Sequence, residues 1–289
     1  MTRLTVVRSG PLTLVQDRGR PGLAYLGVGA AGAMDRAALA LANRLVGNDA
    51  DAAGLEILFG GAEFAADGPV WIAVAGAWGE VAVDGRPIEP HTATRLAAGE
   101  TLAFEAAGHG IRYYLAVRGG IDAPRVLGSR SRDTLASLGP EPLAEGDALP
   151  IGPEPAGPVP PVDLVPVDPP ATGTATLALR PGPRREWFAP AAWESLLHSE
   201  WRVSPRSDRS GVRLEGPMLD RADARELPSE GMVSGAIQVS PDGAPTILAA
   251  DHPVTGGYPV IAVVTDESLD PLAQLRPGQP IRFLLAIGR

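Results

Sequence analysis

Glycine and proline interrupt this chain so often that few segments have room for a long helix. The 289 residues include 35 glycines and 30 prolines, and both residues favour turns over helix or strand interiors. Short runs in which apolar and polar residues alternate lie between them, and this pattern is typical of half-buried strands. The sequence therefore predicts an all-β protein with a few short helices.

A chain of this length has room for about two domains, each with its own core. Prolines in the segment 150–170 are too dense for a helix or a central strand. We therefore interpret residues 151–175 as a linker. The predicted domains are residues 1–150, which include one helix at 34–46, and residues 176–289.

The helix predicted at 34–46 has the sequence MDRAALALANRLV, in which apolar residues recur on one face. Asp35 is expected in its first turn, where a negative charge complements the helix dipole, and Gly47 is expected to end it. Asn43 lies beside the apolar face, so it is either a buried hydrogen-bonding residue or a tolerated residue at the edge of that face. Further along, Glu56 is a lone acid between apolar neighbours and is expected to point outward from a strand.

The net charge of −9 and a pI near 5.0 argue against nucleic acid or an anionic membrane as a partner, because both require a basic surface. The sequence has no run of eighteen apolar residues, and its first ten residues lack the apolar core of a signal peptide. We therefore expect a cytoplasmic protein.

Cysteine and lysine are both absent, since all 25 basic residues are arginine. Without cysteine, disulfides, thiolate nucleophiles and cysteine-ligated zinc are excluded. Without lysine, the chain has no Schiff-base chemistry, no P-loop lysine and no biotinyl-lysine. The sequence thus predicts no covalent cofactor on this chain, and no set of metal ligands stands out in it.

The segment 229–258 carries more polar groups than a hairpin needs. Its two expected strands are 235–240 and 246–250, joined by a turn that contains Asp242 and Gly243. A hairpin of this kind needs polar residues only in its turn, so polar residues elsewhere in the segment call for another explanation.

Three polar side chains stand outside that turn. Gln238 interrupts an apolar strand, and Asp251 and His252 follow directly after its partner strand. The next residues, Thr255, Gly256, Gly257 and Tyr258, place paired glycines where backbone can approach a ligand closely. This combination suits a site for an anionic or carbonyl-containing small molecule. The alternative is a surface hairpin with a glycine-rich exit turn.

A second candidate is the charged loop 16–22, which follows a predicted strand and contains Asp17 and Arg20. Such loops often carry binding groups, although a solvated turn explains the same composition. A polar loop at 128–134, with two arginines, could bind an anion at its backbone amides or could simply be solvated. Another charged loop, 205–210, has a position in the second half similar to that of the loop 16–22 in the first.

Several of these stretches together resemble one family, the biotin-dependent carboxyltransferase-like proteins that include the C-type component of bacterial 5-oxoprolinase. The matching stretches occur in family order from end to end: GPLTLVQDRGRPG at 10–22, GAMDRAALALANRLVGN at 32–48, LAVRGGID and VLGSRSRDT within 115–134, VSPRSDRSGVRLEGP at 203–217, SEGMVSGAIQVSPDG at 229–243 and TGGYPVIAVV at 255–264. The family also includes the carboxyltransferase region of urea carboxylase, proteins similar to allophanate hydrolase subunit 2, and antagonists of a sporulation-kinase inhibitor.

The resemblance implies two linked cyclophilin-like β-barrels. It also implies functional roles for residues in the matching motifs: Asp17, Arg20, Met34, Asp35, Asn43, Gln238, Asp242, Gly243, Thr255, Gly256, Gly257 and Tyr258. Many relatives have a basic residue where this chain has Val260, and a more polar stretch than its residues 251–254. One charge at a binding loop can decide which anion is bound, so these departures concern the substrate rather than the fold.

The resemblance leaves three functions open. The first is a subunit of an ATP-dependent 5-oxoprolinase, which opens the lactam of 5-oxoproline to glutamate with A-type and B-type (kinase-inhibitor-like) partner subunits, ATP being used through the complex. Gln238 would then donate to the substrate carbonyl, and Asp251 or His252 would direct a water as general base. The second is a carboxyltransferase component that receives biotin on another polypeptide and carboxylates urea or another amide. The third is a non-enzymatic antagonist that binds a partner regulatory protein.

Overall fold

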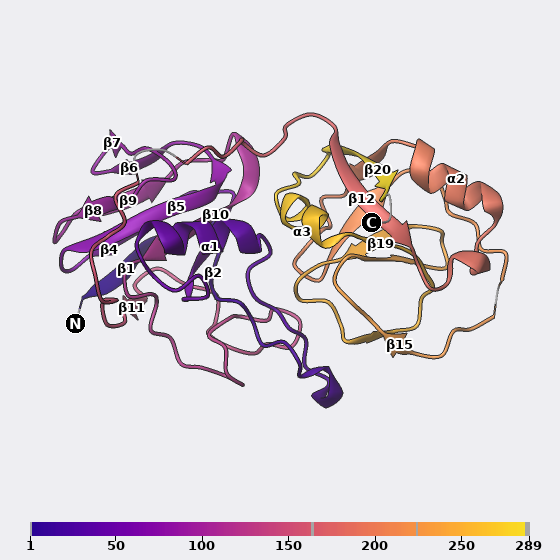
Figure 1. Cartoon of the computed structure of the whole chain (residues 1–289), viewed down its shortest axis with the longest axis horizontal. Coiled ribbons are helices and arrows are strands. Elements are labelled where there is room, and N and C mark those ends of the chain that lie inside the picture. The colour runs from indigo at the N-terminus through magenta and orange to yellow at the C-terminus, as the bar shows by residue number, and fades with distance from the viewer. Residues whose placement is uncertain (1, 163–164, 224, 287–289) are drawn as a thin grey trace. The chain divides into compact units, whose positions relative to one another are not determined.

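The computed structural model describes residues 2–162, 165–223 and 225–286. Its contacts divide the chain into two compact units (Figure 1). The first unit comprises Met1–Arg20, Asp35–Asp133 and Ser137–Pro170, and the second comprises Pro21–Met34, Thr134–Ala136 and Ala171–Arg289. Within the predicted linker, Asp163 and Leu164 lie outside the described residues. The domain boundaries drawn along the sequence remain a prediction.

The first unit is built from a six-stranded and a five-stranded sheet. Their strand orders are β11-β1-β4-β9-β6-β7 and β2-β3-β10-β5-β8. The bounds of these strands are β1 Arg3–Ser9, β2 Leu12–Gln16, β3 Gly54–Leu58, β4 Ala62–Ala66, β5 Val70–Trp78, β6 Val81–Val83, β7 Arg86–Pro87, β8 Thr94–Leu96, β9 Thr101–Phe104, β10 His109–Val117 and β11 Ala148–Pro150. The helix α1, Arg36–Leu45, lies across β5 and β10 (Figure 1).

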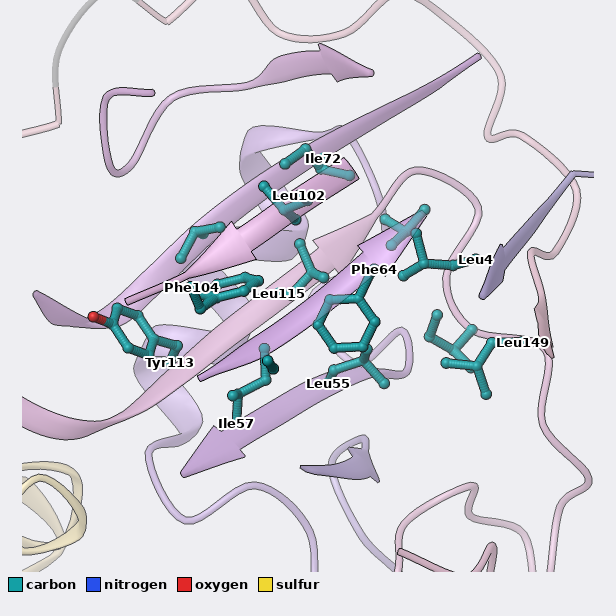
Figure 2. Packing of buried hydrophobic residues seen from close by; sticks show 14 of the residues in the cluster. Leu4, Leu55, Ile57, Phe64, Ile72, Leu102, Phe104, Tyr113, Leu115 and Leu149 are labelled. Carbon is teal, nitrogen blue, oxygen red and sulfur yellow. The ribbon is translucent and has the colours of Figure 1, made fainter. Parts of the chain in front are cut away.

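The core of this unit lies between the two sheets, as Figure 2 shows. Phe64 of β4 and Phe104 of β9 meet edge to face at 6.0 Å between ring centroids. Phe104 in turn packs edge to face on Tyr113 of β10, at 5.4 Å. Edge-to-face packing is a favoured arrangement of aromatic rings, so these rings join the two sheets through directed contacts as well as apolar burial.

The helix predicted at 34–46 is confirmed, with Asp35 as its N-cap rather than in its first turn. The Asp35 carboxylate accepts a hydrogen bond from the Ala38 backbone N–H at 2.9 Å, which satisfies one of the donors left over at a helix start. Gly47 follows the last turn with a φ of 73°, the left-handed conformation that glycine supplies after a helix end. Asn43 is fully buried and donates to the Ala52 carbonyl at 2.8 Å, so it is the buried hydrogen-bonding residue of the two alternatives.

The second unit is a closed barrel of seven strands in the order β12-β19-β16-β17-β14-β13-β20. The strand bounds here are β12 Ala175–Pro181, β13 Trp201–Val203, β14 Gly211–Glu215, β15 Glu230–Gly231, β16 Ala236–Val239, β17 Pro245–Leu248, β18 Thr255–Gly256, β19 Val260–Val264 and β20 Pro280–Leu285. The short strands β15 and β18 pair with each other in a separate two-stranded sheet. The all-β prediction with a few short helices is therefore confirmed, and this closed barrel fits the cyclophilin-like fold that the resemblance implies.

Two helices belong to the barrel unit. The predicted helix with proline at its first position is α2, Pro190–His198. The sequence did not predict α3, Asp266–Ala273, which has Pro271 inside it. Proline inside a helix removes a backbone donor and normally argues against one, whereas the two carboxylates in the first turn of α3 favour a helix start.

Candidate active site

Gln238 is a polar residue on a buried strand of the barrel. All four residues of β16 are buried, and the Gln238 side chain retains only 9% exposure. The pairing of β16 with β19 is irregular at this position, since the register shifts between Ile237 and Gln238. Bulges of this kind often lie beside active sites, where they re-aim a side chain.

Hydrogen bonds fix which way the Gln238 amide faces. Its Nε2 lies 3.2 Å from the Tyr258 carbonyl oxygen, which can only accept, and 3.2 Å from the Met232 sulfur. The nitrogen is therefore already engaged, and no donor among the described residues reaches Oε1. In this orientation Gln238 offers a ligand an acceptor for an N–H group, and not the donor to a carbonyl that the sequence led us to expect.

The Gln238 side chain can take this position only because Gly256 has no side chain. It lies in β18, whose residues Thr255 and Gly256 pair with Gly231 and Glu230 of β15. A Cβ at Gly256 would lie 2.5 Å from the Gln238 amide nitrogen, far inside ordinary contact distance. The TGGY motif thus brings bare backbone against the Gln238 side chain, a close approach that only glycine permits.

An aromatic ring and a guanidinium complete the cluster. The Tyr258 ring is 47% exposed, and the Arg221 guanidinium carbon lies 5.8 Å from its centroid. Arg221 donates through Nη2 to the Val239 carbonyl, while its buried Nε has no hydrogen-bond partner among the described residues. A buried, unsatisfied donor on a cation costs free energy, so Arg221 keeps this position beside the Tyr258 ring at some cost in stability. We call Gln238, Gly256, Tyr258 and Arg221 the barrel cluster.

The turn between β16 and β17 confirms the predicted hairpin. Asp242 is exposed, and the hydroxyl of Ser240 together with the Ala244 N–H lowers the pKa of its carboxyl. Gly243 has a φ of 78°, and its carbonyl accepts from the Leu219 N–H at 3.0 Å. Within the described residues both serve the turn itself, and their predicted contact with a substrate remains a prediction.

Asp251 lies in a different part of the same unit. Its carboxylate is 1% exposed and is held by Arg209, with Nε to Oδ2 and Nη2 to Oδ1 both at 2.8 Å. Thr134 adds two bonds to Oδ2, from its N–H at 2.9 Å and its hydroxyl at 2.7 Å. Arg209 also donates to the Gly32 carbonyl at 2.6 Å. Both carboxylate oxygens are therefore occupied, and this geometry favours a positioning role for Asp251 over a role as general base.

His252 is 9% exposed, and its Nδ1 lies 2.8 Å from the Pro253 carbonyl oxygen, which makes that nitrogen the donor. The other ring nitrogen is then the one free to accept a proton. Among the described residues, no hydrogen bond joins Asp251 or His252 to Gln238. Of the three predicted catalytic residues, Gln238 thus belongs to the barrel cluster, Asp251 belongs to the Arg209–Asp251 pair, and His252 belongs to neither.

Asp17 and Arg20 belong to the first unit, and both are buried. Asp17 Oδ1 accepts from the hydroxyls of Ser129 and Ser131, each at 2.6 Å. Arg20 donates through Nε to the Val126 carbonyl at 3.3 Å and through Nη2 to the Ser131 carbonyl. This loop is therefore not the solvated turn that was the alternative interpretation. The structure joins it to the polar loop 128–134 predicted separately.

Glu56 was expected to face outward, and this expectation is wrong. Its side chain is 4% exposed and accepts a hydrogen bond from the Tyr114 hydroxyl at 2.7 Å, with the Arg112 Nε at 3.6 Å. The Tyr114 hydroxyl also accepts from the Asp35 backbone N–H at 2.8 Å. Alternation along β3 could not reveal this, because both faces of that strand are buried.

Tyr114→Phe should lower the free energy of unfolding at pH 8 by about 1–3 kcal/mol, since the Asp35 N–H and the Glu56 carboxylate lose a buried partner. Burial, followed by the charges of Glu56 and Asp35, raises the pKa of Tyr114 well above 10. The folded state thus holds this proton more tightly than the unfolded state. The resulting stability is present below pH 10 and is lost as the pH rises above that value.

The absence of lysine makes this alkaline effect measurable, because tyrosines are then the main side chains that titrate between about pH 9 and pH 11.5. Urea unfolding at pH 8–11 should show a decline of up to about 1.4 kcal/mol per pH unit from Tyr114, and this part should vanish in Tyr114→Phe. Tyr25→Phe, at an 80% exposed position, is the control and should change nothing. An equal decline in Tyr114→Phe and in the unmodified chain would contradict the assignment.

Comparison with known proteins gives a consistent result. The family described as carboxyltransferase domain, subdomain A and B, matches residues 26–285. The chain is 40% identical over 286 residues to the C-type component of 5-oxoprolinase from Escherichia coli (strain K12), covering 97% of this chain and 90% of that protein. It is 33% identical to the protein of the same name from Haemophilus influenzae, covering 93% and 86%. The crystal structure of the Kluyveromyces lactis urea amidolyase matches 99% of this chain and 19% of its own with a TM-score of 0.91 and 29% identity.

Among the described residues, no helix is both long and apolar enough to cross a membrane.

Proposed function

Because this chain belongs to the carboxyltransferase domain family, we propose that it is a subunit of an ATP-dependent 5-oxoprolinase that hydrolyses the lactam of 5-oxoproline to glutamate. The observation that carries the proposal is the 40% identity to the C-type component of 5-oxoprolinase across nearly the whole chain. Identity to the urea amidolyase structure is lower, at 29%. The A- and B-type subunits are the proposed partners, and ATP is used through the complex.

The polar and aromatic groups of the barrel cluster suit the chemical groups of 5-oxoproline. 5-Oxoproline carries a lactam N–H, a lactam carbonyl and a carboxylate on one small ring. The Gln238 Oε1 is an acceptor for the N–H, and the Arg221 guanidinium, 5.8 Å from the centroid of the Tyr258 ring, supplies positive charge for the carboxylate. The exposed Tyr258 ring offers an apolar face to the ring of the substrate. Together these contacts would hold the lactam in one orientation.

Ring opening needs the carbonyl activated, because a lactam is a stabilised amide. Transfer of the γ-phosphoryl group of ATP to its oxygen activates the carbonyl carbon. Attack of one water there, with cleavage of the C–N bond and protonation of the released amine, opens the ring to an acyl phosphate. A second water hydrolyses the acyl phosphate to glutamate and phosphate. Contacts that hold the substrate in the reactive orientation raise the reaction rate, because the reacting groups no longer have to find that orientation by diffusion. His252, with one ring nitrogen free to accept a proton, remains a proposed base for the water.

The test is reconstitution. The chain is co-expressed with A- and B-type 5-oxoprolinase subunits, purified as a complex, and supplied with 5-oxoproline and ATP. Glutamate should form only with all subunits and ATP present, and this chain alone should be inactive. Co-elution on size-exclusion chromatography is the matching binding assay. Glutamate formation without this chain would contradict the proposal, and so would separate elution at micromolar concentration.

A carboxyltransferase function is the second candidate, favoured by the family description and by the urea amidolyase match. The same Gln238 acceptor would suit a urea N–H. Since the chain has no lysine, biotin would have to arrive on another polypeptide. Transfer of carboxylate from a carboxylated biotin carrier protein to urea, measured in parallel with the lactam assay, separates the two functions.

A further inference from the structure

The first unit contains a polar pocket of about 470 Å³ that the proposed reaction does not use. This volume lies in the range of small-molecule sites. Its charged lining lies on two sets of loops: one carries Arg18, Arg125 and Arg130 together with Asp17 and Asp122, which pairs with Arg130, and the other carries Asp49, Asp51 and Glu154. We call these the arginine wall and the acid wall.

The arginine wall presents Arg18, Arg125 and Arg130. Asp17 builds it, because its carboxylate accepts from the Arg130 N–H at 2.6 Å and from the Gly19 N–H at 2.8 Å. These bonds, with those from the two serine hydroxyls, tie the loop after β2 to the loop at 128–131. Asp17 thus has every oxygen engaged and serves as the internal support of the wall.

The three arginines are not equally engaged. Arg130 donates to Asp122, yet its Nε is buried without a hydrogen-bond partner among the described residues. Arg125 contacts only a backbone carbonyl, that of Gly128 at 3.2 Å, and both Arg18 and Arg125 are exposed. The wall therefore retains positive charge and donor capacity that the protein itself does not satisfy.

The acid wall presents Asp49 and Asp51, both exposed, on the loop that follows α1. Asn48 anchors this loop by donating to the Val117 carbonyl at 2.8 Å and accepting from the Gly119 N–H at 2.9 Å. Glu154 extends the wall and lies 3.9 Å from the Arg118 Nε. The carboxylates of Asp49 and Asp51 thus stand on an anchored loop separate from those that carry the arginines.

From this division of charge we infer that the pocket binds a free α-amino acid as its zwitterion, with the carboxylate at the arginine wall and the ammonium at the acid wall. A simple anion would face Asp49 and Asp51, and a diamine would face the arginines. A metal ion fits poorly, because the described residues contain no group of three or more histidine, aspartate or glutamate ligands. The exposed guanidinium groups of Arg18 and Arg125 give the carboxylate charge-assisted bonds to make.

The experiment measures binding to the purified full chain by isothermal titration calorimetry. The probes are L-glutamate, glutarate, which lacks the ammonium, and 1,5-diaminopentane, which lacks both carboxylates. L-Glutamate should bind saturably and at least tenfold more tightly than either of the others. Arg125→Gln and Asp51→Asn should each weaken glutamate binding roughly tenfold or more, the loss expected for one charge-assisted contact.

Arg95→Gln and Glu89→Gln are the matched controls, since both residues are exposed in the same unit and neither lines the pocket. They should leave binding unchanged. Equal binding of glutamate and glutarate would overturn the zwitterion inference, and so would absence of saturable glutamate binding in the millimolar range. Because this assay uses the isolated chain and no ATP, its failure leaves the 5-oxoprolinase proposal standing.

Discussion

Arg209→Ala is expected to lower the free energy of unfolding by about 3–5 kcal/mol, the range for removing one partner of a buried ion pair. The reason is that Asp251, at 1% exposure, would be left as a buried charge without its two guanidinium bonds. For a chain of this size the loss corresponds to a fall in Tm of roughly 6–20 °C. Thermal and urea unfolding of the single variant measure it.

Two further variants make the result specific. Arg225→Ala removes a guanidinium whose side chain is 76% exposed and pairs with Asp223, so it should leave the free energy of unfolding nearly unchanged. Arg209→Met combined with Asp251→Leu removes both charges and should recover much of the loss, because the penalty arises from an unpaired buried charge. A double variant as unstable as Arg209→Ala would show that the shape of the pair, rather than its charge, is what the fold requires.

Gly256→Ala should reduce kcat/KM for ATP-dependent 5-oxoproline hydrolysis by roughly 100-fold in the reconstituted complex. The new methyl group would lie 2.5 Å from the Gln238 Nε2, so the side chain must move by about 1 Å, and a displacement of this size at a reacting centre can cost on the order of a hundredfold. Steady-state kinetics in the complex and the Tm of the chain are measured together. The expected pattern is lost activity with partner binding retained.

Gly173→Ala, in the same unit, is the matched control for this prediction. Its added methyl group would meet nothing within 4 Å, and activity should stay near that of the unmodified chain. Gln238→Met, similar in volume but without the acceptor, should reproduce the loss seen in Gly256→Ala. Full activity in both Gly256→Ala and Gln238→Met would place the site elsewhere in the chain.

Local patterns in the sequence predicted the elements well. The helix α1, Arg36–Leu45, lies within the predicted 34–46, because Asp35 and Gly47 mark its two ends. Asp84-Gly85, a dipeptide typical of two-residue hairpin turns, joins β6 to β7 with positive φ at both residues. These features depend on a few neighbouring residues, so a single sequence is enough to predict them.

The candidate site was predicted only in part, since it depends on contacts between distant residues. The motif identified Gln238 and Tyr258, but only the bond between them shows which face of the amide is free. Asp251 looks like a free acid after a strand, and its partners Arg209 and Thr134 lie 42 and 117 positions away. Arg221 was missed because its neighbours in sequence give no sign of the Tyr258 ring.

The interleaving of the two units sets an order of events during synthesis. Thr134 is made 117 positions before Asp251, an interval of roughly 6–23 seconds at the usual 5–20 residues per second. All segments of the first unit are made before the barrel is complete, so that unit can fold while 21–34 and 134–136 still lack their barrel partners. A barrel produced alone from residue 171 would lack the Gly32 and Thr134 groups that contact its Arg209 and Asp251. During synthesis the segments 21–34 and 134–136 thus stay without these partners until Arg209 and Asp251 have been made.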